Sequence, residues 1–263
     1  MDLDGTALQE DHESFTPGLN EMLLRVHEKG IIVIPCTGRP YGFLPSVLEK
    51  KAEWMSLAIC ADGAEIRNLK DGTILSGEYM KSEDVLSMMK LSEDPDIAFE
   101  AMTDNCVYLS EESLRKEQRD AGRLSYHLNH VLKKKADISA INKDLERIEK
   151  MNLFCMEETS RKKIRKVSEE MKVSCAETDF RHFEVTSIRA SKAEGMKKVC
   201  QYFRIPLSET MAIGDSWNDS SVLSMAGISV AMGNAPEALR KDCTYVTGRY
   251  DEDGVADFLE RLL

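Results

Sequence analysis

Apolar residues in the first part of the chain alternate between helical spacing and short continuous runs. After Thr16-Pro17, they recur at helical spacing from Leu19 to Val26, with the threonine as a candidate N-cap and the proline at the first helical position. Gly30 predicts where this helix ends. The pattern therefore predicts a helix with one buried face.

Two apolar runs follow this helix. Residues 31–34 read Ile-Ile-Val-Ile, and residues 57–61 form a second run, so each predicts a buried strand of a parallel sheet. We expect a helix between them, from Tyr41 to Lys51. This strand–helix–strand alternation predicts an α/β core with helical crossovers.

The middle of the chain is rich in Lys, Glu and Met and predicts mostly helix. Lys70-Asp71-Gly72 predicts a hairpin turn just before it. Shorter strands are expected at residues 97–101, 106–109, 152–156, 173–176 and 182–186.

The end of the chain returns to the first pattern. It predicts helices at residues 192–203, 218–226, 236–240 and 254–262, and strands at residues 210–213, 228–231 and 244–246. We therefore expect an α/β core made of residues 1–76 and 187–263, interrupted by an inserted α+β domain at residues 77–186.

Composition narrows the functional classes. The 263 residues include 46 acidic and 35 basic side chains, a formal charge of −11, which argues against nucleic acid or an anionic membrane as the main partner. No apolar run reaches the roughly 20 residues that a membrane helix needs. The seven cysteines form no C-x-x-C pair, so they predict neither a disulfide framework nor a zinc site and fit a cytoplasmic protein.

The first candidate for chemistry is Asp2-Leu3-Asp4-Gly5-Thr6. Two carboxylates at positions i and i+2 of a strand end point to the same side, and the glycine allows a sharp turn. Such a pair can divide nucleophilic attack and proton transfer between its members. By itself, the same pattern suits an acidic turn equally well.

A second candidate, residues 214–219, reads Gly-Asp-Ser-Trp-Asn-Asp and follows an apolar strand. Ligands of open α/β sheets bind beyond the carboxyl ends of the strands, where Asp215 and Asp219 could hold a hard cation such as Mg²⁺. Helix capping by Asn218 or Asp219 is the simpler interpretation, but it does not easily explain both acidic residues.

Two weaker signals complete the set. Thr37-Gly38-Arg39 follows the first predicted strand, where a hydroxyl and main-chain N–H groups could cradle a phosphate. Lys192 begins a predicted helix, where its ammonium could offset the charge of a nucleophile and a phosphate. Taken alone, an ordinary turn and a solvated lysine are the commoner interpretations.

Together and in this order, the four signals resemble the haloacid dehalogenase superfamily of phosphohydrolases. The resemblance spans nearly the whole chain and is closest to the Cof-type (subclass IIB) sugar-phosphatase branch, to which residues 214–219, 226–227 and 230–235 are very similar. It implies a Rossmann-like parallel-sheet core with an inserted α+β cap of the C2B type. It also implies a Mg²⁺-dependent phosphatase that hydrolyses small phosphate esters, such as sugar phosphates, through an aspartyl-phosphate.

The resemblance assigns a role to each matching residue. Asp2 would be the nucleophile and Asp4 the general acid/base. The phosphate would be bound by Leu3, Thr37, Gly38, Lys192 and Asn218. The metal would be held by Asp2, the main-chain carbonyl of Asp4, Asp215 and Asp219.

The chain departs from the branch at two places. Only Met1 precedes Asp2, where the family has an apolar strand, so we expect the native start to lie upstream. Asp62 stands where the branch usually has Asn, and we favour a harmless turn over altered substrate contacts. Two other functions stay open: a phosphotransferase or phosphohexomutase of the same superfamily, and a catalytically inactive binding module.

Overall fold

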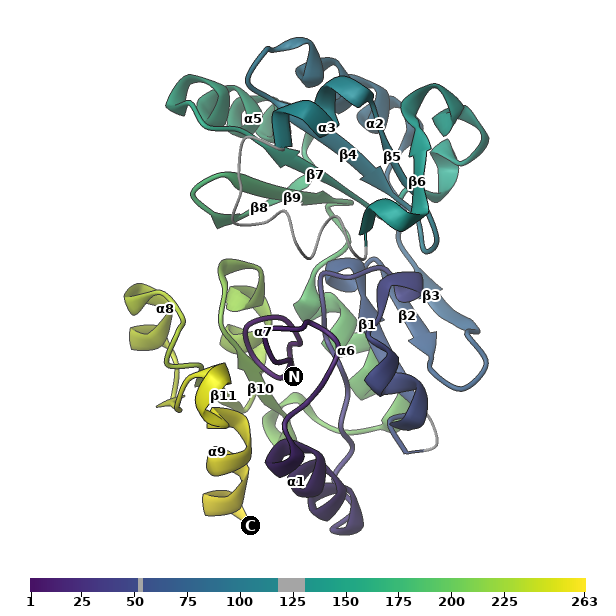
Figure 1. Cartoon of the computed structure of the whole chain (residues 1–263). Helices are drawn as coiled ribbons and strands as arrows, with labels where there is room; N and C mark the ends of the chain where they lie inside the picture. Colours follow the sequence, from purple (N-terminus) through teal and green to yellow (C-terminus); the bar gives the residue numbers. More distant parts are fainter. Residues whose placement is uncertain (52–53, 118–130) are drawn as a thin grey trace. The chain divides into compact units, whose positions relative to one another are not determined.

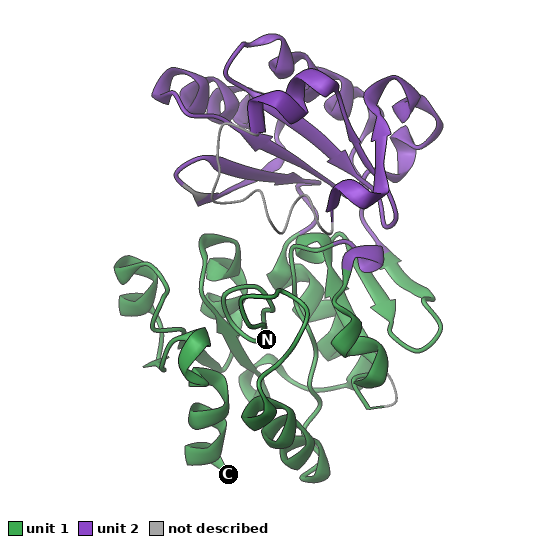
Figure 2. Ribbon diagram, viewed as in Figure 1, with its two compact units in different colours: residues 1–39, 44–76, 191–263 green, residues 40–43, 77–190 purple. Residues whose placement is uncertain are grey.

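The computed structural model describes residues 1–51, 54–117 and 131–263 (Figure 1). The chain forms two compact units, coloured separately in Figure 2: Met1–Arg39 with Leu44–Ser76 and Ser191–Leu263, and Pro40–Phe43 with Gly77–Ala190. Residues 40–43 and 187–190, which the sequence analysis assigned to the core, group with the second unit. No helix in the described ranges has the length and apolar character to cross a membrane.

The first unit is built from helices that flank short sheets. Its helices are α1 (Pro17–Glu28), α6 (Lys192–Phe203), α7 (Ser220–Met225), α8 (Glu237–Asp242) and α9 (Gly254–Leu262). Its strands are β1 (Leu57–Cys60), β2 (Glu65–Asn68), β3 (Ile74–Gly77), β10 (Met211–Gly214), β11 (Ile228–Ala231) and β12 (Tyr245–Val246).

Helix α1 begins and ends where the sequence predicts. The Thr16 hydroxyl accepts a hydrogen bond from the Leu19 amide, which satisfies one of the free N–H groups of the first turn. The apolar positions from Leu19 to Val26 are buried in the core. Local capping and periodicity thus suffice to define this element.

The parallel sheet predicted for the C-terminal part is present. Strands β10, β11 and β12 pair in that order and run parallel, with Ile213 opposite Val230 and Val230 opposite Tyr245. The β1–β2–β3 sheet is antiparallel at β1–β2, and a turn at residues 69–72 links β2 to β3, as the hairpin signal predicts.

Two predictions for residues 31–51 are wrong. Residues 31–34 form no strand, and the Ile31 and Ile32 side chains are 44% and 38% exposed. The apolar run indicates a high propensity for strand. A buried strand also needs neighbouring strands to which its main chain can hydrogen-bond. The helix predicted from Tyr41 to Lys51 is instead two short 3₁₀ helices, Tyr41–Phe43 and Ser46–Lys51, because Pro45 cannot sit inside a continuous helix.

The second unit is one sheet with helices on one face (Figure 1). Its strands pair in the order β6–β5–β4–β7–β9–β8, antiparallel except for β5 with β6. The strands are β4 (Ala98–Met102), β5 (Val107–Leu109), β6 (Lys135–Asp137), β7 (Lys150–Phe154), β8 (Ser174–Asp179) and β9 (His182–Thr186). The helices are α2 (Ser82–Met89), α3 (Glu111–Glu117) and α5 (Glu158–Met171).

Candidate active site

Asp2 lies at the carboxyl end of β10. Its amide donates to the carbonyl of Ile213 (2.9 Å), while the Cys36 amide donates to the carbonyl of Met1 (2.8 Å). The first residues therefore lie between β10 and residue 36, where functional groups collect in open α/β sheets. Gly5 then turns the chain with a φ of +72°, a conformation that glycine adopts without a steric penalty.

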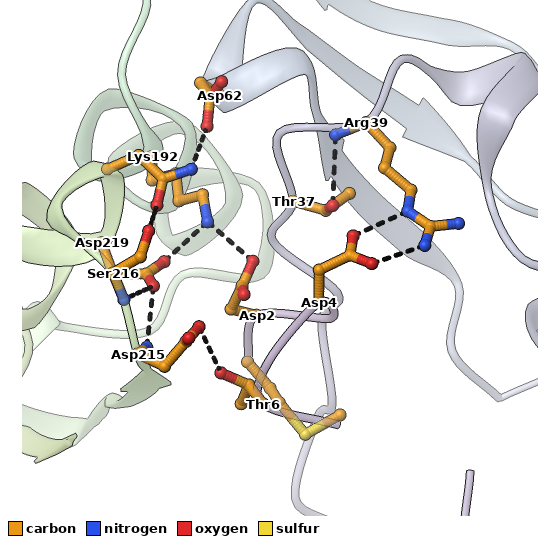
Figure 3. A network of polar contacts seen from close by, with 12 residues as sticks. Asp2, Asp4, Thr6, Thr37, Arg39, Asp62, Lys192, Asp215, Ser216 and Asp219 are labelled. Atoms are coloured by element: carbon orange, nitrogen blue, oxygen red, sulfur yellow. Dashed lines mark hydrogen bonds and ion pairs between the residues drawn. The ribbon is translucent and has the colours of Figure 1, made fainter. Parts of the chain in front are cut away.

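Lys192 joins two buried carboxylates (Figure 3). Its Nζ donates to Oδ1 of Asp2 (2.7 Å) and to Oδ1 of Asp219 (2.6 Å), and the lysine side chain has no exposed surface. Ser191 caps helix α6 by accepting from the Glu194 amide, which fixes Lys192 at the first helical position. Lys192, which the sequence analysis named as a candidate cation of the site, thus pairs with two carboxylates of the candidate site.

Asp215 completes an acidic cluster, defined here as Asp2, Asp215 and Asp219. The Thr6 hydroxyl donates to Oδ1 of Asp215 (3.2 Å), and Asn234 Nδ2 donates to Oδ2 (3.1 Å). A Cβ at Gly5 would collide with the Asp215 carboxylate, so the first motif requires glycine for space as well as for its φ.

The charges of the acidic cluster do not balance. Three carboxylates face one ammonium, and burial together with the Asp219 charge raises the pKa of Asp2 well above its ordinary value and that of Asp215 to about 7. Burial lowers the pKa of Lys192, but the charges of Asp2 and Asp219 more than offset this and hold it above its ordinary value. A cation that joins the cluster would relieve the repulsion between the carboxylates.

The geometry of the acidic cluster fits a divalent cation. One oxygen from each carboxylate lies within 4.8 Å of the others. Oδ2 of Asp219 accepts from the amides of Asp215 (3.0 Å) and Ser216 (3.1 Å), and its Oδ1 accepts from Lys192. Asp2 and Asp215 therefore have more free lone pairs to offer a cation than Asp219 has.

Asp4 lies in the opposite environment. Arg39 holds its carboxylate with two hydrogen bonds, from Nε (2.7 Å) and Nη2 (2.6 Å), and Nδ1 of His12 lies 2.7 Å from Oδ1. Burial raises the pKa of Asp4, but the contacts with His12 and Arg39 prevail and hold it well below its usual range. We call Asp4, His12 and Arg39 the Asp4 clamp.

Two of the predicted phosphate-binding residues, Thr37 and Asn218, lie in the loop after residues 31–34 and in the 3₁₀ helix Trp217–Asp219. Thr37 is buried: its amide donates to the Ile59 carbonyl (2.9 Å), and its hydroxyl accepts from the Arg39 amide (3.2 Å). Asn218 accepts from the Ser216 hydroxyl (2.6 Å) and donates to Oδ1 of Asp62 (3.1 Å).

The predicted phosphate-binding residue Leu3 could reach the site only through its main chain. Its side chain is buried in the apolar core, and its carbonyl accepts from the amides of Ala7 and Leu8 (both 2.9 Å). Gly38 is half-buried between Thr37 and Arg39.

Asp62 is more than a turn residue. It adopts a φ of +54°, which suits a short polar side chain, and its amide donates to the Thr37 carbonyl (3.0 Å). Its carboxylate also accepts from Asn218, so it links the loops that carry Thr37 and Asn218. The residue in place of the usual Asn therefore contacts a predicted phosphate ligand.

Sequence reasoning assigned no role to several residues of the site. Arg39 was visible in the Thr37-Gly38-Arg39 motif and Asn234 in the motif after β11, but nothing local indicated that they reach Asp4 and Asp215. His12 carried no signal, because its contact with Asp4 depends on the path of the intervening loop.

The model of the haloacid dehalogenase-like hydrolase family matches residues 1–259. The chain belongs to this family. The phosphatase YwpJ of Bacillus subtilis is 29% identical, with 100% of this chain and 98% of the relative covered. The 5-amino-6-(5-phospho-D-ribitylamino)uracil phosphatase YwtE of the same organism is 27% identical over 100% of this chain and 96% of its own.

Solved structures agree with the haloacid dehalogenase fold. A haloacid dehalogenase-like hydrolase from B. subtilis has a TM-score of 0.85 at 25% identity, covering 100% of this chain and 98% of its own. The subclass IIB sugar phosphatase BT4131 has a TM-score of 0.84 at 23% identity, covering 99% and 96%, a likeness that concerns the fold. The predicted fold class, family and enzyme class, a haloacid dehalogenase-like phosphatase, are confirmed.

Proposed function

We propose that this enzyme is a Mg²⁺-dependent phosphatase that hydrolyses small phosphate esters through an aspartyl-phosphate on Asp2. The observation that supports this most is the contact of Lys192 with Asp2 inside the acidic cluster. With Oδ1 oriented by the lysine, Oδ2 of Asp2 is the oxygen that can attack phosphorus. Phosphoryl transfer depends mainly on such positioning and on charge stabilisation.

Asp2 and Asp215 would bind Mg²⁺ directly, together with the main-chain carbonyl of Asp4, and Asp219 would stand behind them. This order follows from the number of hydrogen bonds that each carboxylate accepts: Asp219 accepts three, Asp215 two and Asp2 one. When bound, Mg²⁺ would neutralise charge on the phosphate and on the attacking carboxylate.

The reaction would proceed in two displacements. Asp2 attacks phosphorus, the P–O bond to the alcohol breaks, and the leaving oxygen takes a proton from Asp4. Asp4 then removes a proton from a water that attacks the aspartyl-phosphate, which releases phosphate and restores Asp2. Because the Asp4 clamp favours the ionised carboxylate, proton donation requires the contacts with His12 and Arg39 to loosen when substrate binds.

Phosphate binding would use groups on several elements. We assign it to the Thr37 hydroxyl, the main chain at Leu3 and Gly38, the Lys192 ammonium and the Asn218 amide. Hydroxyl, amide and ammonium donors suit the oxygens of a phosphate, and bound Mg²⁺ together with Lys192 would offset the net charge of −11 that opposes an anionic substrate.

The substrate class is proposed from the relatives. YwtE acts on a phosphorylated ribitylamino-uracil and BT4131 is a sugar phosphatase, so we propose a phosphorylated small metabolite, such as a sugar phosphate. We assign choice of substrate to the second unit, as a cap domain. All seven cysteines are free thiols, which fits the proposed cytoplasmic location.

The test measures phosphate release from p-nitrophenyl phosphate and a panel of sugar phosphates, with Mg²⁺ or with EDTA. We expect turnover that needs Mg²⁺ and is lost in Asp2→Asn, whereas Asp11→Asn, a control in an exposed part of the following loop, keeps it. An isomerised sugar phosphate without free phosphate would favour a phosphohexomutase. Metal-independent turnover, or turnover that survives Asp2→Asn, would refute the proposal.

A further inference from the structure

Within the described residues, the chain passes between the two units at four places. It leaves the first unit after Ser76 and returns to it at Ser191, as an inserted domain requires. It also leaves the first unit briefly after Arg39, so residues 40–43 group with the second unit, as the colours of Figure 2 show. We call residues 40–43 the tether loop. Because the tether loop follows Thr37-Gly38-Arg39 directly, one peptide bond joins a candidate phosphate-binding segment to the second unit.

The tether loop is held within the second unit on both sides of Gly42. The Gly42 amide donates to the carbonyl of Asp104 (2.8 Å), and the Gly42 carbonyl accepts from Nζ of Lys134 (2.5 Å). A Cβ at Gly42 would lie 2.1 Å from the carbonyl oxygen of Asp104, which is too close for any side chain, so this contact requires glycine. The main chain of Gly42 is thus bound by residues that are distant in the sequence.

Phe43 anchors the same loop in an apolar cluster. Its side chain is buried and belongs to a cluster with Met102, Val107 and Leu109 of strands β4 and β5. Nζ of Lys134 also lies 5.1 Å from the centre of the Phe43 ring, a distance that suits a cation–π contact. Because exposing a buried aromatic ring is costly, the tether loop should follow any displacement of the second unit.

Arg39 is held just as firmly in the first unit. Its amide donates to the Thr37 hydroxyl (3.2 Å), and its carbonyl accepts from the amide of Ala61 (2.9 Å). Its guanidinium holds the Asp4 carboxylate and also donates to the carbonyl of His12 (3.0 Å). Both the main chain and the side chain therefore fix Arg39 beside the residues of the candidate active site.

Only Pro40 and Tyr41 lie between Arg39 and Gly42. The proline ring fixes one backbone dihedral angle, and the Phe43 amide donates to the Pro40 carbonyl (2.9 Å), which closes a 3₁₀ turn. Two residues span at most about 7 Å when fully extended, so this link has little slack. A displacement of the second unit must therefore strain the turn or move Arg39.

We propose that the tether loop couples the position of the second unit to the Asp4 clamp, with Lys134 and Gly42 as positioning residues that act through Arg39. When the second unit shifts as substrate binds, the tether loop draws Arg39 away from Asp4 and frees the carboxylate to exchange a proton. This inference rests on the proposed function, in which the clamp must loosen before Asp4 donates a proton. Such coupling is reciprocal, so a change at the clamp must also reach the tether loop.

The first experiment compares kcat/KM for phenyl phosphate and for p-nitrophenyl phosphate in the parent protein and in Lys134→Met. The two esters have nearly the same shape, but phenolate is the poorer leaving group and gains more from a proton donated by Asp4. Because the variant leaves the clamp tight, we expect kcat/KM to fall about tenfold for phenyl phosphate and less than about threefold for p-nitrophenyl phosphate. Lys133→Met, at the exposed neighbouring lysine, should match the parent with both esters.

Gly42→Ala breaks the same contact by a different route, since the new Cβ would collide with the carbonyl of Asp104. We expect the same selective loss with phenyl phosphate, and a Tm within about 3 °C of the parent. A loss of equal size with both esters would indicate a merely structural role for the tether loop and would overturn the proposal. Unchanged kcat/KM in either Lys134→Met or Gly42→Ala would also overturn it.

Amide hydrogen exchange tests the coupling without catalysis. Lys134→Met should speed exchange of the Ala61 amide, which donates to Arg39, at least about threefold, and Arg39→Gln should do the same to the Gly42 amide. The Ile228 amide should exchange as in the parent in both variants. Unchanged exchange at either Ala61 or Gly42 would contradict the coupling. A protein that hydrolyses neither ester would refute the proposed function, whereas these exchange rates would still decide whether the tether loop couples the two units.

Discussion

Asp2 and Asp4 lie two residues apart, yet their carboxylates lie in opposite electrostatic environments. Asp2 belongs to the acidic cluster, where burial and neighbouring carboxylates raise its pKa. Asp4 belongs to the Asp4 clamp, where His12 and Arg39 lower its pKa. Environments that separate the pKa values of two nearby carboxyl groups are typical of sites in which the two groups have different roles.

The two environments indicate different roles for the carboxylates of Asp2 and Asp4. The acidic cluster carries surplus negative charge, which a cation can neutralise, so it suits a nucleophile that works beside a metal. The Asp4 clamp supplies its own cationic partner and holds Asp4 ready to accept a proton. The stability and activity of the protein should therefore respond differently to a change of cation in the acidic cluster and to a change of cation in the Asp4 clamp.

Loss of the Lys192 ammonium should have the largest effect on the acidic cluster. Lys192→Ala would leave Asp2 and Asp219 buried without their shared partner, at a cost of about 3–5 kcal/mol in the free energy of unfolding, and would abolish turnover. Urea unfolding measures this. The control is Lys197→Ala on the same helix, whose half-exposed pair with Glu194 contributes about 1 kcal/mol or less. Equal losses in the two variants would contradict the role given to Lys192.

A divalent cation should stabilise the acidic cluster in a pH-dependent way. The pKa of Asp215 is raised to about 7, so its folded form prefers the proton, and stability without metal should fall as pH rises from about 4 to 7. Saturating Mg²⁺ should raise the Tm by about 5–10 °C at pH 8 and by less at pH 5. Asp215→Asn should reduce both effects and leave the part of the pH dependence that Asp2 contributes. Calorimetry with EDTA or Mg²⁺ checks this, and a larger Mg²⁺ effect at pH 5 would contradict it.

Arg39→Gln should remove the hydrogen bonds that position the Asp4 carboxylate and help to lower its pKa. We expect kcat/KM to fall about 10–100-fold, because a misplaced Asp4 transfers protons poorly. The lowered pKa of Asp4 adds stability above the ordinary pKa near 4, and this is lost as pH falls below it. Arg39→Gln should therefore show a smaller loss of stability between pH 5 and 3 than the parent. Arg25→Gln, at an exposed arginine, serves as the control. If Arg39→Gln lost as much stability between pH 5 and 3 as the parent protein does, the role given to the Asp4 clamp would be contradicted.

Asp62→Asn should have the smallest effect. The amide keeps a side chain suited to the positive φ but removes a negative charge whose field reaches Lys192. We expect the KM for a phosphate ester to fall by about two- to fivefold with little change in Tm. Asp71→Asn, in the exposed β2–β3 turn, is the matched control. A rise in KM specific to Asp62→Asn would indicate a direct contact with substrate instead.

Elements with complete local signals were predicted to the residue. Lys192–Phe203, Ile228–Ala231 and Gly254–Leu262 have the predicted bounds, because their apolar patterns lie within the segments themselves and Ser191 also caps the first of them. Strand β6 was missed, since Lys135-Ala136-Asp137 carries no apolar run and forms a strand only by pairing with β5.

The sequence predicted those site residues that lie in recognisable sequence motifs. Asp2, Asp215, Asp219 and Lys192 were named because each lies in a recognisable segment, and the fold brings them together. The Asp4 clamp was not foreseen, because its bond from Arg39 joins residues 35 apart and leaves no periodic trace in the sequence. Ionic contacts across loops follow from the fold rather than from local pattern.

In the proposed mechanism, Asp2 carries the phosphoryl group during turnover. The most direct measurement is rapid acid quench of the enzyme with substrate and Mg²⁺, followed by mass spectrometry of the N-terminal peptide. We predict one added phosphoryl group on Asp2, present during turnover and absent in EDTA. A phosphoryl group on another residue, or turnover with an unmodified Asp2 peptide at every quench time, would contradict the account.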